Sequence, residues 1–208
     1  GQGIIIQEYL SDNGTAFRNA DFTKHLERFH QTTKYAGVGA HHSNGVAERS
    51  IGTVLSIACA MLHHAALHWP DVADIELWPL AVLHTVYILN RIPDEKTGLS
   101  PLELFTRKTW PRSKLHDLHV WGCPTYILDN DLANGKKLPR WRPRSNRFVY
   151  MGVSPKHSST VPLVLNLDTG HIGVQYHAVF DDWFKTVSAT TDELPNFDQD
   201  EWYETFGS

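Results

Sequence analysis

The chain has 208 residues and a formal net charge of −4, with 41% apolar and 20% charged residues. Seven Trp, nine Phe and seven Tyr suffice for a hydrophobic core and exclude an intrinsically disordered chain, and the length suggests one or two domains. Cys59 and Cys123 lack the spacing of a zinc site or a disulfide framework, which fits an intracellular, reducing setting. We expect no signal peptide and no apolar run as long as a membrane span.

The first predicted elements lead to two acidic residues. Residues 3–10 are expected to form a strand that ends in the turn Asp12-Asn13-Gly14, because Asn and Gly tolerate turn conformations. The spacing of apolar residues predicts a helix over 20–30, and a short strand follows at about 31–36. Residues 36–45 contain three Gly and are expected to form a loop.

A long helix is predicted at about 46–66, with one apolar stripe that includes Ala58, Leu62 and Ala65. Glu48 lies in its first turn, where the helix dipole favours a carboxylate. Thirty-five residues separate Asp12 from Glu48. Two acids brought together from a strand end and a helix can hold a divalent cation. Each acid alone could equally be an ordinary turn or first-turn residue.

Further helices are expected over 75–91, with a broad apolar face for packing, and from Ser100-Pro101 to about Phe105. The connector 107–115 is basic and contains Trp110, which could stack on a base or pack on a neighbouring domain. From residue 118 the apolar period becomes two. Short strand-like segments with turns at 134–135 and 168–170 predict a small barrel, and the expected strands are 120–123, 124–128, 147–153, 161–167 and 171–180.

Charge is unevenly distributed along the second half of the chain. Residues 107–147 hold ten of the nineteen basic side chains, whereas residues 181–208 hold eight acids and Lys185 as the single basic residue. A basic segment can neutralise phosphates and release counterions. We therefore expect a nucleic-acid contact through these side chains: Lys108, Arg140, Arg142 and Arg144. The alternative is a solvated surface, which we favour for the turn at Lys136-Lys137.

Seven short sequences, in order along the chain, resemble one known family. They are SDNGTAF (11–17), NGVAER (44–49), LWPLAVLHTVYILNRIP (77–93), GLSPLELF (98–105), WGCPTY (121–126), RFVYMGVS (147–154) and HAVFDD (177–182). Together they resemble the second half of a retroviral-type integrase core and the small SH3-like domain that follows it in the Pol polyprotein of copia-type LTR retrotransposons. The resemblance covers roughly residues 4–182.

The resemblance implies a fold and a division into domains. The expected fold is an α/β RNase H-like integrase core fragment without its first strands, followed by a small all-β SH3-like barrel. The implied ranges are a partial core (1–92), a helical and basic linker (93–115), the barrel (116–184) and an acidic flexible tail (185–208).

The resemblance also implies a function, DNA integration by 3′-end processing and strand transfer. Asp12 and Glu48 would be the second and third acids of an Asp-Asp-Glu triad that binds Mg²⁺ or Mn²⁺. His42, Asn44 and Arg49 would contact DNA. The implied partners are element ends and target DNA, with a homo-oligomer when intact, a nuclear location when functional, and no membrane.

Two departures from the family pattern qualify these expectations. The first acid of the triad has no counterpart here, so we expect the isolated chain to bind metal weakly and not to catalyse integration. Ser50, Ile51 and Gly52 follow Arg49 where the family usually has a Lys and an Asn. The alternatives are a decayed or host-retained module that binds DNA or protein without catalysis, or another RNase H-like nuclease. The barrel expected after residue 116 argues against the nuclease.

Overall fold

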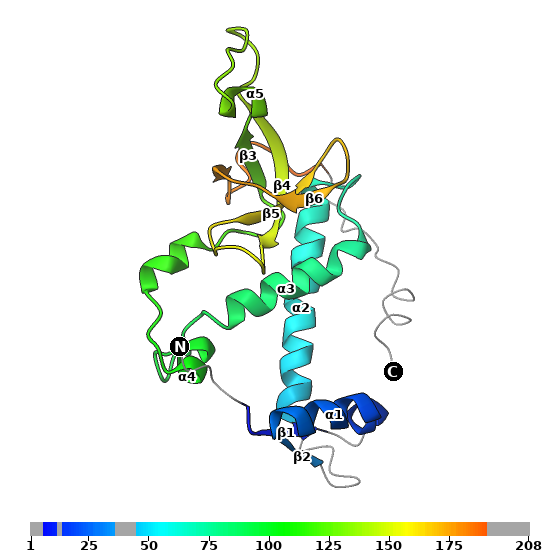
Figure 1. Ribbon diagram of the computed structural model, residues 1–208. Helices are drawn as coiled ribbons and strands as arrows, with labels where there is room; N and C mark the ends of the chain where they lie inside the picture. Colours follow the sequence, from blue (N-terminus) through cyan, green and yellow to red (C-terminus); the bar gives the residue numbers. More distant parts are fainter. Residues whose placement is uncertain (1–5, 12–13, 36–44, 191–208) are drawn as a thin grey trace. The chain divides into compact units, whose positions relative to one another are not determined.

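Figure 1 shows a computed structural model, which describes residues 6–11, 14–35 and 45–190. Two compact units, Gly1–Thr53 and Val54–Ser208, make up the chain, and the boundary falls within one long helix. The fold is mixed α/β, and each unit has a sheet of its own.

The first unit is a β-α-β crossover. Strands β1 (Glu8–Ser11) and β2 (Thr32–Tyr35) are parallel, and η1 (Thr15–Arg18) and α1 (Ala20–Phe29) connect them. Parallel strands require such a crossover. The Asn19 side chain caps α1 by accepting a hydrogen bond from the Phe22 N–H at 2.7 Å. The helix predicted over 20–30 and the strand predicted at 31–36 are confirmed.

A small aromatic cluster joins α1 to β1 in this unit. The Phe22 ring makes edge contacts with Tyr9 and Phe17, with ring centroids 6.0 and 5.9 Å apart. The Tyr35 hydroxyl donates to the Phe17 carbonyl at 2.8 Å, and Leu26 is buried. These contacts hold η1 and α1 against the two strands.

Helix α2 (Gly45–His68) extends the predicted helix of 46–66 by a few residues. Its buried residues all lie after the unit boundary, at Ala58, Leu62, Ala65 and Ala66. The predicted apolar stripe is therefore buried from Ala58 onward, whereas Ile51 is exposed.

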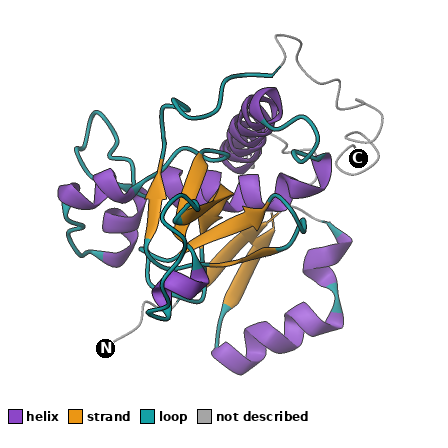
Figure 2. Ribbon diagram, turned by 90° about the horizontal axis from the view of Figure 1, so that it is seen from above, coloured by secondary structure: helices purple, strands orange, loops and turns teal. Residues whose placement is uncertain are grey.

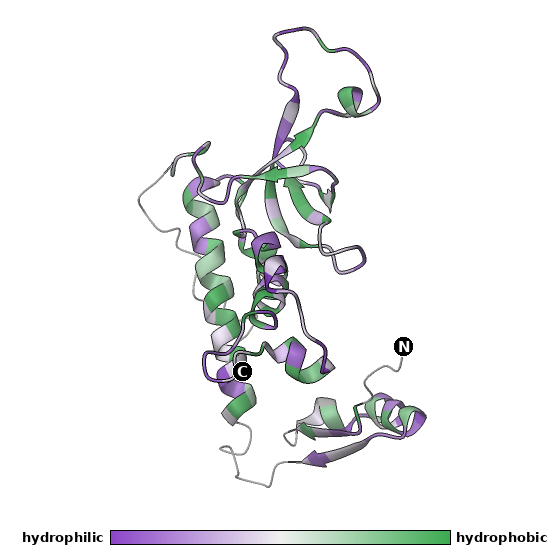
Figure 3. Cartoon of the chain, turned by 90° about the vertical axis from the view of Figure 1, so that its left-hand side faces the viewer, coloured by the Kyte–Doolittle hydropathy of each residue, from purple (hydrophilic) through white to green (hydrophobic). Residues whose placement is uncertain are grey.

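The expectation that no apolar run reaches the length of a membrane span is wrong for α2. An 18-residue window in this helix has a mean hydropathy of 1.5, because Asp, Glu, Lys and Arg are absent after Arg49 (Figure 3, green). By length and composition alone the helix could cross a membrane, although only one helix in the described residues meets this test. Core helices of soluble proteins pass the same test, so this is weak evidence for a membrane segment.

The second unit continues with short helices and a five-stranded sheet. The predicted helix of 75–91 appears as two elements, and the helices are η3 (Ile75–Leu77), α3 (Trp78–Leu89), α4 (Pro101–Thr106), η4 (Arg112–Asp117) and α5 (Asn130–Ala133). The strands are β3 (Pro124–Leu128), β4 (Ser145–Val153), β5 (Pro162–Asn166), β6 (Ile172–Val174) and β7 (Ala178–Phe180).

All neighbouring strands of this sheet are antiparallel, in the order β6-β5-β4-β3-β7 (Figure 2, strands in orange). The register of β4 on β5 shifts between Tyr150 and Gly152, so the pairing is irregular at this point. Two of the expected strands differ: 120–123 is a loop, and 171–180 divides into β6 and β7.

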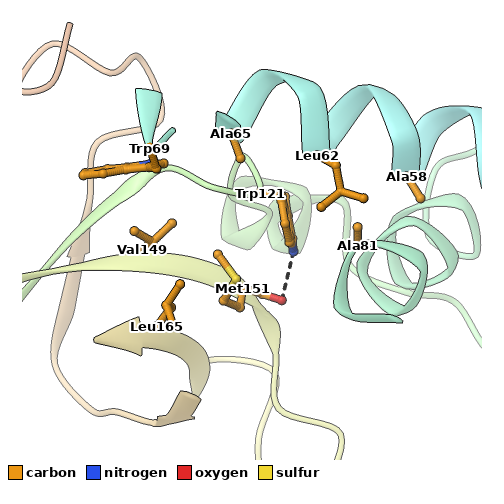
Figure 4. Packing of buried hydrophobic residues seen from close by; sticks show 9 residues of the cluster. All are labelled: Ala58, Leu62, Ala65, Trp69, Ala81, Trp121, Val149, Met151 and Leu165. Carbon is orange, nitrogen blue, oxygen red and sulfur yellow. Dashed lines mark hydrogen bonds between the residues drawn. The ribbon is translucent and has the colours of Figure 1, made fainter. Parts of the chain in front are cut away.

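One hydrophobic core serves both the helices and the sheet of this unit (Figure 4). Trp121 lies at its centre with 1% of its surface exposed, and its indole N–H donates to the Met151 carbonyl at 3.1 Å. The Trp69 indole N–H donates to the Gly122 carbonyl at 2.8 Å. The cluster consists of Ala58, Leu62, Ala65, Trp69, Ala81, Trp121, Val149, Met151 and Leu165.

This shared core divides the chain differently from the four predicted ranges. The predicted boundaries at 92 and 115 separate α2 and α3 from the sheet, whereas Ala58 and Ala81 pack with Val149 in the same cluster. The four ranges stay a prediction.

Gly122 marks a close approach between the 120–123 loop and α2. Its φ is +83°, a conformation that favours glycine, and a Cβ built on it would lie 2.7 Å from the Cβ of Ala65. Its N–H donates to the Tyr150 carbonyl at 2.8 Å. The backbone therefore meets the helix at a position that only glycine fits without a shift.

Helix α4 begins with a capping box, as Ser100-Pro101 predicted. The Ser100 hydroxyl accepts from the Glu103 N–H at 3.3 Å, and the Glu103 carboxylate accepts from the Ser100 N–H at 2.8 Å. The same carboxylate accepts from the Trp110 N–H at 3.0 Å. These backbone hydrogen bonds, from Ser100 first and Trp110 second, lower the pKa of Glu103 to about 2.

We expect Ser100→Ala to lower the free energy of unfolding by about 1 kcal/mol, because the first turn of α4 would lose its cap. Urea denaturation of the full chain measures this difference. Ser113→Ala, at an exposed position in η4, is the matched control and should change the stability by less than about 0.5 kcal/mol. Equal effects of the two substitutions would contradict the assignment.

Candidate nucleic-acid interface

Of the residues expected at a metal site, the structure describes one. Glu48 lies in the first turn of α2 and is exposed, with Arg49 exposed beside it. Asp12, His42 and Asn44 lie outside the described residues. The convergence of Asp12 and Glu48 therefore stays a prediction. Within the described part of the chain, no group of three His, Cys, Asp or Glu side chains could hold a metal ion.

Five basic residues lie in the connection between β3 and β4, residues 129–144, which we call the basic loop. In Figure 1 it extends from the ends of these two strands beyond α5. All its basic side chains are exposed, and they are Lys136, Lys137, Arg140, Arg142 and Arg144. The loop thus presents, on one connection, the three arginines predicted to bind nucleic acid.

Asp129 holds the base of the basic loop together. It is only 8% exposed, and its carboxylate accepts from the Asp131 N–H at 2.9 Å, which caps α5. Its own N–H donates to the Arg144 carbonyl at 2.9 Å. Its other carboxylate oxygen lies 3.9 Å from the Arg142 guanidinium. One buried acid therefore ties both sides of the loop where it leaves the sheet.

The charges of the basic loop are only partly neutralised. Lys136 pairs with Asp131 at 3.0 Å, and both side chains are substantially exposed, as expected of a solvated surface pair. Arg142 makes the long contact with Asp129. Arg140 and Arg144 form no ion pair with any residue that the structure describes. These two guanidinium groups are the ones most available to phosphate.

Trp141 lies between these arginines and is 94% exposed. The sequence prediction missed it, because tryptophan is usually assigned to a core. The available signal was its place in Pro139-Arg140-Trp141-Arg142-Pro143, an aromatic residue between basic residues.

In the connector 107–115 the two candidate residues differ in exposure. Lys108 is exposed, as expected of a phosphate contact, but Trp110 is half-buried. The Trp110 backbone is fixed by Glu103, and the guanidinium carbon of Arg91 lies 5.8 Å from its ring centroid. Arg112 pairs with Glu103 at 3.2 Å. The packing alternative is therefore favoured for Trp110.

A separate cavity of about 420 Å³ lies beside α3 and β4 and contains a buried histidine. His84 is 2% exposed, and its Nε2 lies 3.2 Å from the His119 carbonyl oxygen. Since a carbonyl can only accept, Nε2 carries the proton and Nδ1 is an acceptor without a partner in the described structure. Burial lowers the pKa of His84 to about 4, so this histidine is neutral at pH 7.

No protein-family model matches the chain. The chain is similar to two curated proteins of Arabidopsis thaliana. It is 28% identical over 183 residues to the retrovirus-related Pol polyprotein from transposon RE1, and 26% identical over 183 residues to that from transposon RE2. Each match covers 88% of this chain and 10% of the polyprotein. The chain thus spans about a tenth of the length of the curated relatives it matches.

Among solved structures, the chain is similar to a cryo-EM structure of the simian T-cell lymphotropic virus intasome in complex with the PP2A regulatory subunit B56 gamma. The identity is 15% and the TM-score 0.37, over 90% of this chain and 59% of the other. A likeness this weak carries no argument about fold or function.

Proposed function

We propose that this chain acts in DNA integration, as part of the integrase region of a copia-type retrotransposon Pol polyprotein, and that it binds nucleic acid through the basic loop. Similarity to two transposon Pol polyproteins over 88% of the chain supports the integrase part. The β1-α1-β2 crossover followed by a helix with Glu48 in its first turn is what half of an RNase H-like core would contain. The five-stranded antiparallel sheet suits the SH3-like domain of the proposal.

In this proposal Asp12 and Glu48 hold a divalent cation, Mg²⁺ or Mn²⁺. The Glu48 carboxylate is exposed and supplies the hard oxygen donor that these ions prefer. A bound ion would neutralise charge on a phosphodiester. The proposal also includes a homo-oligomer that works on DNA in the nucleus.

The observation that carries the nucleic-acid part is the exposure of Arg140, Arg142 and Arg144 on one connection. Arginine forms paired hydrogen bonds with phosphate through its planar guanidinium. Each phosphate that it neutralises releases condensed counterions, so binding must weaken as salt rises. The buried Asp129 fixes the base of the loop, which reduces the ordering cost of binding.

We expect the triple variant R140Q/R142Q/R144Q to bind duplex DNA about tenfold or more weakly than the wild type at 0.1 M salt. The slope of log K against log salt should become less negative by up to about 3, because as many as three phosphate contacts are lost, each contributing about 0.9. Fluorescence anisotropy of a labelled duplex, titrated at several salt concentrations, measures both quantities.

The matched control is K24Q/R28Q/K96Q, which removes the same charge at exposed positions outside the loop. It should leave the salt slope within about 1 of the wild type. An unchanged slope in R140Q/R142Q/R144Q, or an equal loss in the control, would contradict binding through the basic loop.

A non-catalytic binding module is the second candidate function. The residues that follow Arg49 in α2 favour it. The Ser50 hydroxyl donates to the Val46 carbonyl at 2.8 Å and the Thr53 hydroxyl to the Arg49 carbonyl at 2.9 Å. These hydroxyls bond to their own helix, and α2 carries no Lys or Arg after Arg49 that could contact DNA. Under this alternative, E48Q should leave DNA binding unchanged with or without Mn²⁺, whereas a metal-dependent loss would favour the integrase.

A further inference from the structure

Trp141 is the most exposed large apolar side chain described, and no contact within the described residues accounts for its position. Trp69 and Trp121 are 7% and 1% exposed and fill the core. Burying an aromatic ring removes a large apolar area from water. An exposed ring can therefore gain binding free energy when a ligand covers it. A single exposed aromatic residue is not unusual by itself. The chemistry of the residues beside Trp141 indicates which kind of ligand its ring could contact.

The neighbours of Trp141 are cationic, and the backbone around it is restricted. Arg140 and Arg142 flank it directly, with Arg144 two residues further on. Pro139 and Pro143 fix φ on either side and restrict the residues before them. The Arg142 N–H donates to the Pro139 carbonyl at 3.1 Å, which closes a turn around Trp141. The backbone that carries the exposed indole ring is therefore restricted.

We propose that Trp141 stacks on an unpaired nucleobase while Arg140 and Arg144 contact the adjoining phosphates, so that the basic loop selects single-stranded or frayed nucleic acid over continuous duplex. Within a duplex the faces of each base are covered by the next pair, whereas an unpaired base offers a face to an aromatic ring. Stacking of this kind with cationic side chains along the backbone is how single strands are bound without sequence preference. The inference rests on the proposed function of the loop.

A second exposed tryptophan has the opposite surroundings and serves as the matched control. Trp183 is 82% exposed but follows Asp181 and Asp182. The carboxylate of Asp181 accepts from the Thr186 N–H at 2.8 Å, and that of Asp182 from the Val120 N–H at 2.8 Å. Phosphate would be repelled from these acids, so exposure alone does not make Trp183 a candidate.

The test compares two labelled probes, an oligothymidylate and a blunt-ended hairpin duplex, by fluorescence anisotropy with the full chain. Trp141→Ala should weaken binding of the oligothymidylate by about 5- to 150-fold, the range that corresponds to one stacked base. The affinity for the duplex should change by less than about twofold, and the salt slope should stay the same because no charge is removed. Trp141→Phe should retain most of the binding, and Trp183→Ala should alter neither probe.

Three outcomes would overturn the inference. Trp141→Ala could bind the oligothymidylate as the wild type does, or lose both probes equally. A poly-glutamate peptide could displace the oligothymidylate as effectively as unlabelled oligothymidylate of the same charge, which would assign the loop to an acidic protein. Failure of the wild type to bind either probe would instead refute the proposed function. Thermal melting of each variant checks folding. If the alanine variant melts early, Trp141→Leu, which is apolar but has no aromatic face, carries the test and should lose oligothymidylate binding as the alanine variant would.

Discussion

Trp121→Ala is expected to lower the free energy of unfolding of the second unit by about 3–5 kcal/mol. Trp121 is the largest fully buried side chain described, and its ring packs with Leu62, Ala81 and Met151 from α2, α3 and β4. Its removal leaves a cavity that this cluster cannot fill without moving helices and sheet together. The Met151 carbonyl would also lose its hydrogen bond from the indole N–H.

Urea denaturation followed by circular dichroism measures this loss. Trp183→Ala is the control, because it removes the same side chain from an 82% exposed position and should cost less than about 0.5 kcal/mol. A small effect of Trp121→Ala would mean that helices and sheet do not depend on a common core.

The second large effect concerns His84 and pH. Its pKa is about 4 in the fold and 6.5 in the unfolded chain. Between these values the unfolded state binds more protons, so stability is fully present above pH 6.5 and is lost as pH falls toward 4. A shift of this size corresponds to about 3 kcal/mol. Burial also lowers the pKa of His64, which adds to the loss in the same direction.

His84→Gln should reduce this pH-dependent loss, because glutamine does not titrate and its amide can still donate to the His119 carbonyl. Denaturation at several pH values between 7 and 4 gives the slope for each protein. His171→Gln, at an exposed position, should keep the wild-type slope. A wild-type slope in His84→Gln would show that another group causes the loss.

Local patterns in the sequence predicted the helices and most strands. Phe22 and Leu26 at helical spacing predicted α1, and Ser100-Pro101 predicted the start of α4. These elements follow from capping and periodicity over neighbouring residues. The loop at 120–123 was not predicted, because apolar residues there fit a strand equally well. Trp121 and Gly122 turn toward α2, a contact that only the tertiary structure reveals.

The candidate interface was only partly predictable for a similar reason. A cluster of Arg in a segment rich in Pro predicts exposure, and Arg140, Arg142 and Arg144 are exposed. The two tryptophans near basic residues could not be distinguished by sequence. Trp110 is half-buried and its backbone is bound by Glu103, whereas Trp141 is 94% exposed on the basic loop. The proposed pairing of Asp12 with Glu48 lies beyond what the described residues test.

The approach of Gly122 to Ala65 makes the residue that fits at one of these positions depend on the residue at the other. A methyl group at 122 would collide with Ala65, and the positive φ penalises it independently. A larger side chain at position 65 would collide with the backbone at Gly122. The residues that α2 can carry at position 65 and the loop can carry at position 122 therefore constrain each other, and a larger side chain at either position requires the backbone at the other to move.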